Sequence, residues 1–171
     1  MQHRPDRPSA GLGFDELYRR EIGSIRTLAA GLTGSREIGA ELAQEAMLRA
    51  FRNWSRVGEL DRPGAWVRRV VINLATDVHR RRVRELRAVE RLPMADVVGA
   101  ADPADDGFWR ALRALPTAQR NAAVLFYVDD LGVDQIADVL QVGAGTVKRA
   151  LFDARKNLAR TLGTRHVEVI W

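Results

Sequence analysis

Apolar residues recur three and four positions apart along most of the chain, whereas the strict alternation typical of strands is nearly absent. This spacing gathers apolar side chains on one face of an α-helix. In the N-terminal half it predicts helices at residues 14–32, 36–54 and 65–87, with a glycine- and proline-containing loop at 55–64. The fold class that we expect is therefore all-α.

The C-terminal half carries shorter helical segments, at residues 108–115, 120–127, 134–140 and 145–162. Only a glycine-containing turn at 141–144 separates the last two, which is the helix-turn-helix pattern that places its second helix in the DNA major groove. That second helix turns one set of side chains inward and a basic set with one aromatic outward. The inward set is Val147, Leu151, Ala154 and Leu158, and the outward set is Lys148, Arg149, Phe152, Arg155 and Lys156. A phenylalanine among cations suits a groove, where it can touch a thymine methyl, better than a solvated face.

Between these halves, residues 88–107 lose the helical periodicity and carry five acidic residues against one arginine. The flanking segments are basic: residues 1–87 hold 17 arginines and 11 acids, and residues 108–171 hold 9 basic and 6 acidic residues. The sequence thus predicts two small helical domains, at 14–87 and 108–164, joined by an acidic flexible linker at 88–107. A disordered lead-in at 1–13 and a short tail at 165–171 complete the expected organisation. Both domains suit a polyanionic partner.

The helix expected at 65–87 has two distinct faces. Apolar residues such as Val67 and Val71 form one face, and polar residues form the other; these are Arg69, Asn73, Thr76 and Arg80. Arg80, Arg81, Arg82, Arg84 and Arg87 continue the basic character toward the helix end. Arginine binds phosphate with two donors and asparagine can pair with a base edge, so the face suits nucleic acid. Spacing alone leaves this reading and a simple solvated helix end equally open.

The helix expected at 36–54 carries one leucine on an otherwise charged side. Its buried stripe is expected to be Leu42, Ala43, Ala46, Met47, Ala50, Phe51 and Trp54. Gln44, Glu45, Leu48, Arg49 and Arg52 then lie outside. A single exposed leucine usually needs no explanation, but it also suits the apolar centre of a protein-docking face.

Composition excludes several functional classes. The chain has 171 residues and no cysteine, which excludes disulfides, thiolate metal sites and cysteine nucleophiles. A cytoplasmic address is the default expectation, and no apolar run approaches the roughly 20 residues of a membrane span. Asp77 and His79 point apart on a helix, and an acidic linker with Asp102, Asp105 and Asp106 is poorly spaced for a metal. We therefore expect no enzyme activity, no metal and no cofactor.

Three stretches together resemble bacterial RNA polymerase sigma factors of the extracytoplasmic-function (ECF) type, in the sigma-70 family. AELAQEAMLRAFRNW is similar to the polymerase-docking helix of that family, and PGAWVRRVVINLATDVHRRR is similar to its minus-ten element helix. LPTAQRNAAVLFYVDDLGVDQIADVL with GTVKRALFDARKNL is similar to its terminal helix-turn-helix domain. The resemblance spans most of the chain and implies a two-domain factor, with sigma region 2-like and region 4-like domains. Such a factor binds core RNA polymerase, recognises minus-35 and minus-10 promoter elements, and melts DNA to initiate transcription.

The resemblance also implies roles for particular residues. Gln44, Glu45, Leu48 and Arg49 would dock on the polymerase. Asn53, Val57 and Asn73 would hold a flipped base of the minus-ten element, with Arg69, Arg80 and Arg81 on the backbone of the melted strand. Lys148, Arg149, Phe152 and Asp153 occupy the minus-thirty-five contact positions, with Thr146 and Arg155 nearer phosphates. Because many relatives are held inactive by an anti-sigma protein, an anti-sigma factor is a further candidate partner.

Two residues depart from the family pattern. Gln141 stands where the turn usually has glycine, so a left-handed backbone there would be slightly strained. Asp153 would repel phosphate unless it accepts from a cytosine amine or pairs with Arg149 one turn earlier. A free-standing helix-turn-helix transcriptional regulator is the alternative function, and it explains residues 108–164 but leaves Leu48 and the polar face at 65–87 without a role.

Overall fold

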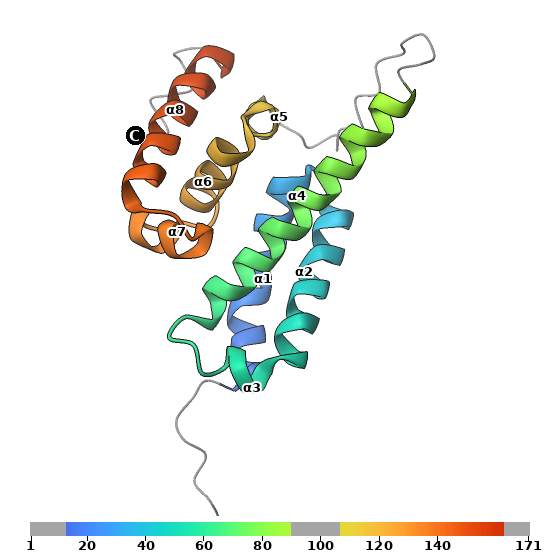
Figure 1. The fold of residues 1–171 in the computed structure, drawn as a ribbon, viewed down its shortest axis with the longest axis vertical. Coiled ribbons are helices and arrows are strands. Elements are labelled where there is room, and N and C mark those ends of the chain that lie inside the picture. Colours follow the sequence, from blue (N-terminus) through green and yellow to red (C-terminus); the bar gives the residue numbers. More distant parts are fainter. Residues whose placement is uncertain (1–12, 90–106, 163–171) are drawn as a thin grey trace, which may run out of the picture.

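The computed structural model describes residues 13–89 and 107–162, and these residues form eight helices and no strand (Figure 1). The first four are α1 (Phe14–Thr33), α2 (Arg36–Arg52), α3 (Trp54–Val57) and α4 (Pro63–Val89). The other four are α5 (Gly107–Ala114), α6 (Thr117–Tyr127), α7 (Val133–Leu140) and α8 (Ala144–Leu162). The expected all-α class is confirmed. The predicted lead-in, most of the predicted linker with Asp102, Asp105 and Asp106, and the predicted tail lie outside the described residues.

Helices α1 and α2 form a tight antiparallel hairpin on which α4 packs (Figure 1). Gly34 ends α1 in the left-handed conformation, at φ +73°, and its N–H donates to the Ala30 carbonyl. Ser35 then begins α2, because its hydroxyl accepts from the Ile38 N–H at 3.2 Å. Gly39 lets the helices approach closely, since a Cβ there would lie 2.6 Å from the Ala30 nitrogen. The largest fully buried side chains of this domain include Leu17, Ile25, Leu28, Met47, Val67 and Val71.

The segment between α2 and α4 differs from the expectation. Helix α2 ends at Arg52 rather than 54, and part of the predicted loop is the four-residue helix α3. Asn53 ends α2 and begins α3, while Val57 is buried at 1% exposure. The half-buried Trp54 packs edge-on against the Phe14 ring, with centroids 5.5 Å apart. This aromatic contact packs the segment after α2 against α1. The spacing of residues along α2 alone does not predict such a contact.

The C-terminal helices form the expected helix-turn-helix in α7 and α8. All four side chains predicted to face inward on α8 are buried: Val147, Leu151, Ala154 and Leu158. Gln141 adopts the left-handed conformation at φ 57°, as considered for this turn, and its N–H donates to the Ala137 carbonyl. Buried Arg120 on α6 donates to the Arg113 carbonyl at 3.0 Å and so ties α6 to the end of α5.

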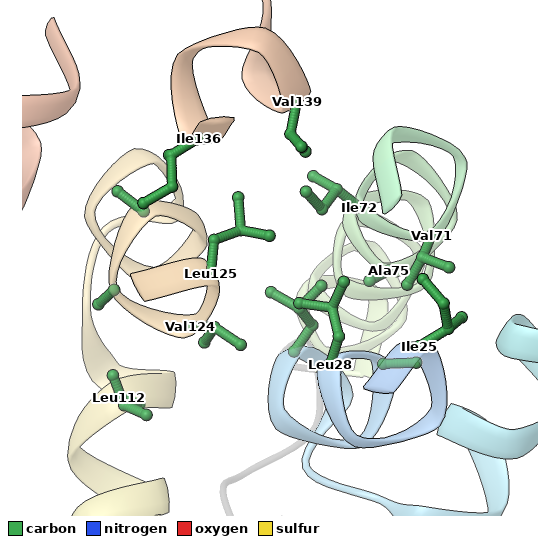
Figure 2. Packing of buried hydrophobic residues seen from close by; sticks show 14 of the residues in the cluster. Ile25, Leu28, Val71, Ile72, Ala75, Leu112, Val124, Leu125, Ile136 and Val139 are labelled. Atoms are coloured by element: carbon green, nitrogen blue, oxygen red, sulfur yellow. The ribbon is translucent and has the colours of Figure 1, made fainter. Parts of the chain in front are cut away.

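The two halves share one continuous apolar core. Figure 2 shows Val139 of α7 directed toward Ile72 of α4, and Val124 and Leu125 of α6 opposite Leu28 of α1. Ile72 and Ala75 are each 6% exposed, so α4 buries a second stripe beyond the one that periodicity predicts. In the two described ranges, no helix is long and apolar enough to cross a membrane.

Candidate nucleic-acid and polymerase interfaces

The outward face of α8 is basic and open to solvent. Thr146, Lys148 and Arg149 are exposed, and Phe152 is the most exposed large hydrophobic residue of the described chain, at 65%. An exposed apolar ring between cations, on a helix whose inner face is buried, suits recognition of a DNA groove. The predicted base-contacting residues Lys148, Arg149 and Phe152 therefore come together on one surface.

Asp153 and Arg155, also on α8, are partnered within the protein. The Arg149 Nε lies 3.5 Å from the Asp153 carboxylate, which is the i,i+4 pairing anticipated as one way to offset its charge. Arg155 donates to the Tyr127 hydroxyl at 2.8 Å, and its guanidinium lies 5.4 Å from the centre of the Phe126 ring. Arg155 is thus tied to α6, whereas the highly exposed Arg149 keeps its side chain at the surface.

The polar face of α4 is only partly available. Asn73, Arg80 and Arg81 are exposed, and Arg80 makes no closer ion pair than 4.0 Å with Asp77. Arg69, in contrast, donates from Nε to the Val139 carbonyl at 3.1 Å and from Nη2 to the Asp138 carbonyl at 2.9 Å. The structure thus leaves three of the four predicted α4 contacts at the surface and engages the fourth with α7.

A buried ion cluster at Arg68 was not anticipated from the sequence. Its guanidinium binds the Glu21 carboxylate of α1 at 2.8 Å and the Asp129 carboxylate that follows α6. Burial alone would lower the pKa of Arg68, but its bonds to Asp129 and Glu21 outweigh that effect and raise it. Burial likewise raises the pKa of Glu21, but the bonds to Arg20 and Arg68 leave it below the ordinary value of 4.5. The feature of the sequence that could have indicated this cluster is an arginine next to the apolar face of α4.

The residues expected to form a base pocket lie at and after the end of α2. Asn53 is exposed, and its amide donates to the Arg49 carbonyl at 2.7 Å, which leaves its side-chain oxygen as an acceptor. The Val57 side chain is buried and so cannot reach a ligand at the surface. Asn53 and Asn73 therefore offer hydrogen-bonding groups, and Val57 offers packing beneath the loop.

The predicted docking face of α2 is at the surface and larger than expected. Leu48 is 38% exposed beside a Glu45–Arg49 pair with a 2.7 Å contact, and Gln44 is exposed. Phe51 was expected inside but is 60% exposed. It follows Leu48 by three positions and Gln44 by seven, so it continues the same stripe of the helix. This i, i+4, i+7 relation was the signal that could have found it.

Near the C-terminal part of α4, positive groups from both domains approach one another. Partial burial, together with the charges of Arg120 and Arg82, lowers the pKa of His79 below 6.5. Burial also lowers the pKa of Arg120, whose Nε has no hydrogen-bond partner. Protonation of His79 therefore opposes the approach of α4 and α6.

Family comparisons agree with this two-domain arrangement. Residues 17–85 match the model for sigma-70 region 2, and residues 106–158 match that for sigma-70 region 4. The chain is 32% identical over 155 residues to the ECF RNA polymerase sigma factor SigM of Mycobacterium tuberculosis, covering 88% of this chain and 77% of that one. It is 29% identical over 159 residues to the RNA polymerase sigma-E factor of Streptomyces antibioticus, covering 92% and 88%.

Solved structures share the fold. RpoE of Bartonella quintana, solved with the anti-sigma factor NepR, matches with a TM-score of 0.70 at 20% identity, over 87% of this chain and 96% of that chain. CnrH, solved with the cytosolic domain of CnrY, matches with a TM-score of 0.64 at 20% identity, over 88% of each chain.

The fold and the two matched regions define a promoter-recognition factor of the sigma-70 class. Within that class, the chain belongs to the ECF sigma factors of bacterial RNA polymerase. It is an alternative sigma factor for transcription initiation, whose partners are core RNA polymerase and promoter DNA. The region 2 match accounts for the residues that a free-standing helix-turn-helix regulator leaves unexplained, and nothing in the comparisons supports that alternative.

Proposed function

We propose that three surfaces of this sigma factor have separate roles in transcription initiation. The outward face of α8 reads the minus-35 element in duplex DNA. The polar face of α4, with the segment around α3, holds the melted minus-10 strand. The α2 stripe of Gln44, Leu48 and Phe51 docks on core polymerase.

The observation that carries the proposal is the α8 face. Phe152 is 65% exposed between Lys148 and Arg149, on a helix whose opposite side is entirely buried. Exposure of a large aromatic costs hydrophobic free energy that a folded domain ordinarily gains by burying it. Contact with a thymine methyl in the major groove recovers that free energy, and the flanking cations bind base edges and phosphates. The exposed Thr146 would contact phosphate at the start of the helix.

For minus-10 recognition, we propose that Asn53 and Asn73 bond the flipped base while Val57 supports the loop from beneath. A flipped base loses a few kcal/mol of stacking, so the pocket must supply hydrogen bonds and packing. Arg80 and Arg81 are exposed and would contact the strand backbone. Arg69 would join them after releasing α7.

For polymerase docking, the exposed apolar pair Leu48 and Phe51 supplies the centre of the interface. Gln44 and the Glu45–Arg49 pair supply a polar rim. By analogy with RpoE bound to NepR and CnrH bound to a domain of CnrY, we also propose an anti-sigma protein as a partner, with both acting in the cytoplasm.

The test is run-off transcription with core polymerase from a related bacterium on a genomic promoter library. We expect discrete start sites that depend on the protein and share two promoter elements. Leu48→Asp should abolish them by preventing assembly with core, whereas Val142→Asp, which changes an equally exposed aliphatic residue of the other domain, should leave core binding unchanged. Start sites that survive Leu48→Asp would refute the docking assignment, and the absence of any start site with core would refute the proposed function.

A further inference from the structure

A pocket of about 420 Å³ lies where the turn between α1 and α2 meets α5. Its volume falls within the roughly 300 to 1,000 Å³ of pockets that hold small-molecule ligands. The pocket is at the start of α2, whereas Asn53 is at the end of that helix (Figure 1). Because the 17 residues of α2 span about 25 Å, the proposed minus-10 contacts around Asn53 lie well away from the pocket. None of the described residues that line it belongs to the three surfaces proposed for initiation.

Three arginines from three helices line this pocket. They are Arg26 of α1, Arg36 of α2 and Arg113 of α5. Of the described residues that line the pocket, none is acidic. The pocket therefore has a positive potential, which favours an anionic ligand. Because arginine binds phosphate with two parallel donors, three arginines suit a phosphorylated ligand with more than one negative charge.

Trp109 of α5 gives the same pocket an aromatic wall. Its half-buried ring rests on α1 at Gly31, where a Cβ would lie 2.7 Å from the ring. Arg113, one turn later on α5, crosses Gly34, where a Cβ would lie 2.6 Å from the Arg113 Cδ. Glycine at these two positions thus makes room for an indole and a guanidinium that line one pocket. Stacking on an aromatic side chain is a common way for proteins to hold a nucleic acid base.

Two hydroxyl groups complete the polar lining of the pocket. Among the described residues, the Ser35 hydroxyl accepts from the Ile38 N–H at 3.2 Å, and the Thr27 hydroxyl donates to the Gly23 carbonyl at 3.2 Å. Ser35 thus keeps its proton for a further bond, and Thr27 keeps its lone pairs. One donor and one acceptor of this kind match the hydroxyls of a ribose, each of which both donates and accepts.

We propose that this pocket binds a purine nucleoside diphosphate or triphosphate, with its base on Trp109 and its phosphates at the three arginines. A simple oxyanion needs only the arginines, and an acidic peptide needs no aromatic wall. Three cations, one indole and two hydroxyls in a single pocket of this volume fit a nucleotide, and a purine offers the larger ring for stacking. Binding there would make the factor sensitive to the same class of compounds that RNA polymerase consumes.

The experiment measures ATP binding to the free full-length chain by isothermal titration calorimetry, without polymerase or DNA. Adenosine and inorganic triphosphate serve as probes that each keep one part of the nucleotide. We expect one ATP per chain, bound about tenfold more tightly than triphosphate, because stacking of the base adds to the phosphate contacts. Adenosine should bind more weakly still. The absence of ATP binding at millimolar concentration, or triphosphate binding as tight as that of ATP, would refute the nucleotide site.

Matched arginine variants locate the phosphates. Arg26→Gln and Arg36→Gln each remove one cation of the pocket, and both residues are exposed, so neither substitution disturbs the core. The controls are Arg19→Gln, two turns earlier on the same face of α1, and Arg52→Gln, at the end of α2. We expect the two pocket variants to bind ATP and triphosphate about tenfold more weakly, because each loses a charge-assisted hydrogen bond, and the controls to match the parent. Equal losses in all four variants would show that ATP responds only to net charge, which would refute the site.

Trp109→Leu and Trp109→Phe test the position of the base. Leucine removes the aromatic ring and phenylalanine keeps one. We expect Trp109→Leu to weaken ATP binding about tenfold while triphosphate binding is unchanged, and Trp109→Phe to retain most of the affinity for ATP. Equal loss of ATP and triphosphate in Trp109→Leu would contradict stacking of the base. Circular dichroism verifies that the helices of each variant persist, and the exposed arginine variants decide the case if Trp109→Leu unfolds.

Two competition measurements separate the nucleotide from other ligands. Displacement of ATP by duplex DNA would place ATP on the basic face of α8. A glutamate-rich peptide that binds as tightly as ATP, and loses affinity in the same variants, would identify an acidic protein segment as the ligand. Either result would overturn the nucleotide site. None of these measurements involves transcription, so failure of the nucleotide site and failure of the proposed function are distinguished.

Discussion

The two helices that we propose to contact DNA, α8 and α4, differ in how exposed their outward faces are. The α8 face is exposed, with Phe152 at 65% and Arg149 open to solvent, and Arg149 pairs with Asp153 of the same helix. The α4 face carries Arg69 bonded to another domain and Ile72 buried beneath it. The proposed α8 surface is thus exposed as it stands, whereas the proposed α4 surface has one of its cations engaged with α7. The difference agrees with the proposed roles, duplex recognition by α8 and capture of the melted strand by α4.

The largest effect is expected at Arg68, the buried cation that pairs with Asp129 of the other domain. Arg68→Met leaves Asp129 buried without a counterion and leaves Glu21 with only the half-exposed Arg20. This should cost about 3 kcal/mol, toward the low end for a broken buried pair because separated domains rehydrate Asp129. Urea unfolding followed by tryptophan fluorescence should show the single transition split in two, as each domain then unfolds by itself.

The control for Arg68→Met is Arg62→Met, which removes an exposed ion pair with Asp138. It should cost less than about 1 kcal/mol because solvent screens that pair. Equal losses in the two variants would show that burial of the Arg68 cluster does not hold the domains together.

The next largest effect is expected on the exposed face of α8. Arg149→Ala should reduce discrimination between the preferred minus-35 sequence and a scrambled one by roughly 1 to 3 kcal/mol. Competition binding to duplex promoters measures it, with Arg160→Ala in the last turn of α8 as the control. A uniform loss on all sequences would instead identify Arg149 as a phosphate contact.

A smaller effect is expected from the exposed asparagine on α4. Asn73→Ala should weaken open-complex formation by about 1 kcal/mol, roughly fivefold, because one hydrogen bond to the flipped base is lost. Permanganate reactivity of promoter thymines measures opening, and core binding should be unchanged. Unaltered opening would remove Asn73 from the pocket, and Glu85→Ala on the same helix serves as the control.

The smallest effect is a pH dependence of the contact between the domains. Because partial burial, Arg120 and Arg82 lower the pKa of His79, this contact favours the neutral imidazole. Its contribution is complete above the ordinary value of 6.5 and is lost as pH falls through the lowered pKa. Energy transfer between dyes on the two domains should therefore decrease modestly between pH 7 and 5, and His79→Gln should flatten this response. A response of the same size in the variant would exclude His79 as its source.

Apolar periodicity predicted the packing within each domain but not the contacts between the two domains. The inward stripe of α8 followed from local spacing, and the left-handed turn at Gln141 followed from the resemblance to the sigma factor family. The burial of Ile72 did not, since Ile72 lies beside the apolar face expected at 65–87, and the burial of Val139 was not predicted either. The same limit explains Phe51, which spacing placed inside but which is 60% exposed. Local patterns specify a helix face, while the partner of a second face depends on the tertiary arrangement.

For the candidate site, the sequence identified which helix faces carry the predicted residues, but not which of those residues contact the other domain. Lys148, Arg149 and Phe152 could be placed on one surface because a helix-turn-helix has a defined inside and outside. The engagement of Arg69 and the pairing of Arg68 with Asp129 link residues about 60 to 70 positions apart. Such contacts leave no periodic trace in a single sequence.

The most direct measurement compares the free chain on two ligands taken from a mapped promoter: duplex minus-35 DNA and single-stranded minus-10 DNA. Fluorescence anisotropy is measured for the parent and for Asp129→Asn. We expect equal duplex affinity for both proteins and at least tenfold tighter single-strand binding by the variant, because a weaker contact between the domains releases Arg69. Single-strand affinity that is unchanged, or that changes in step with duplex affinity, would contradict the difference between the two faces.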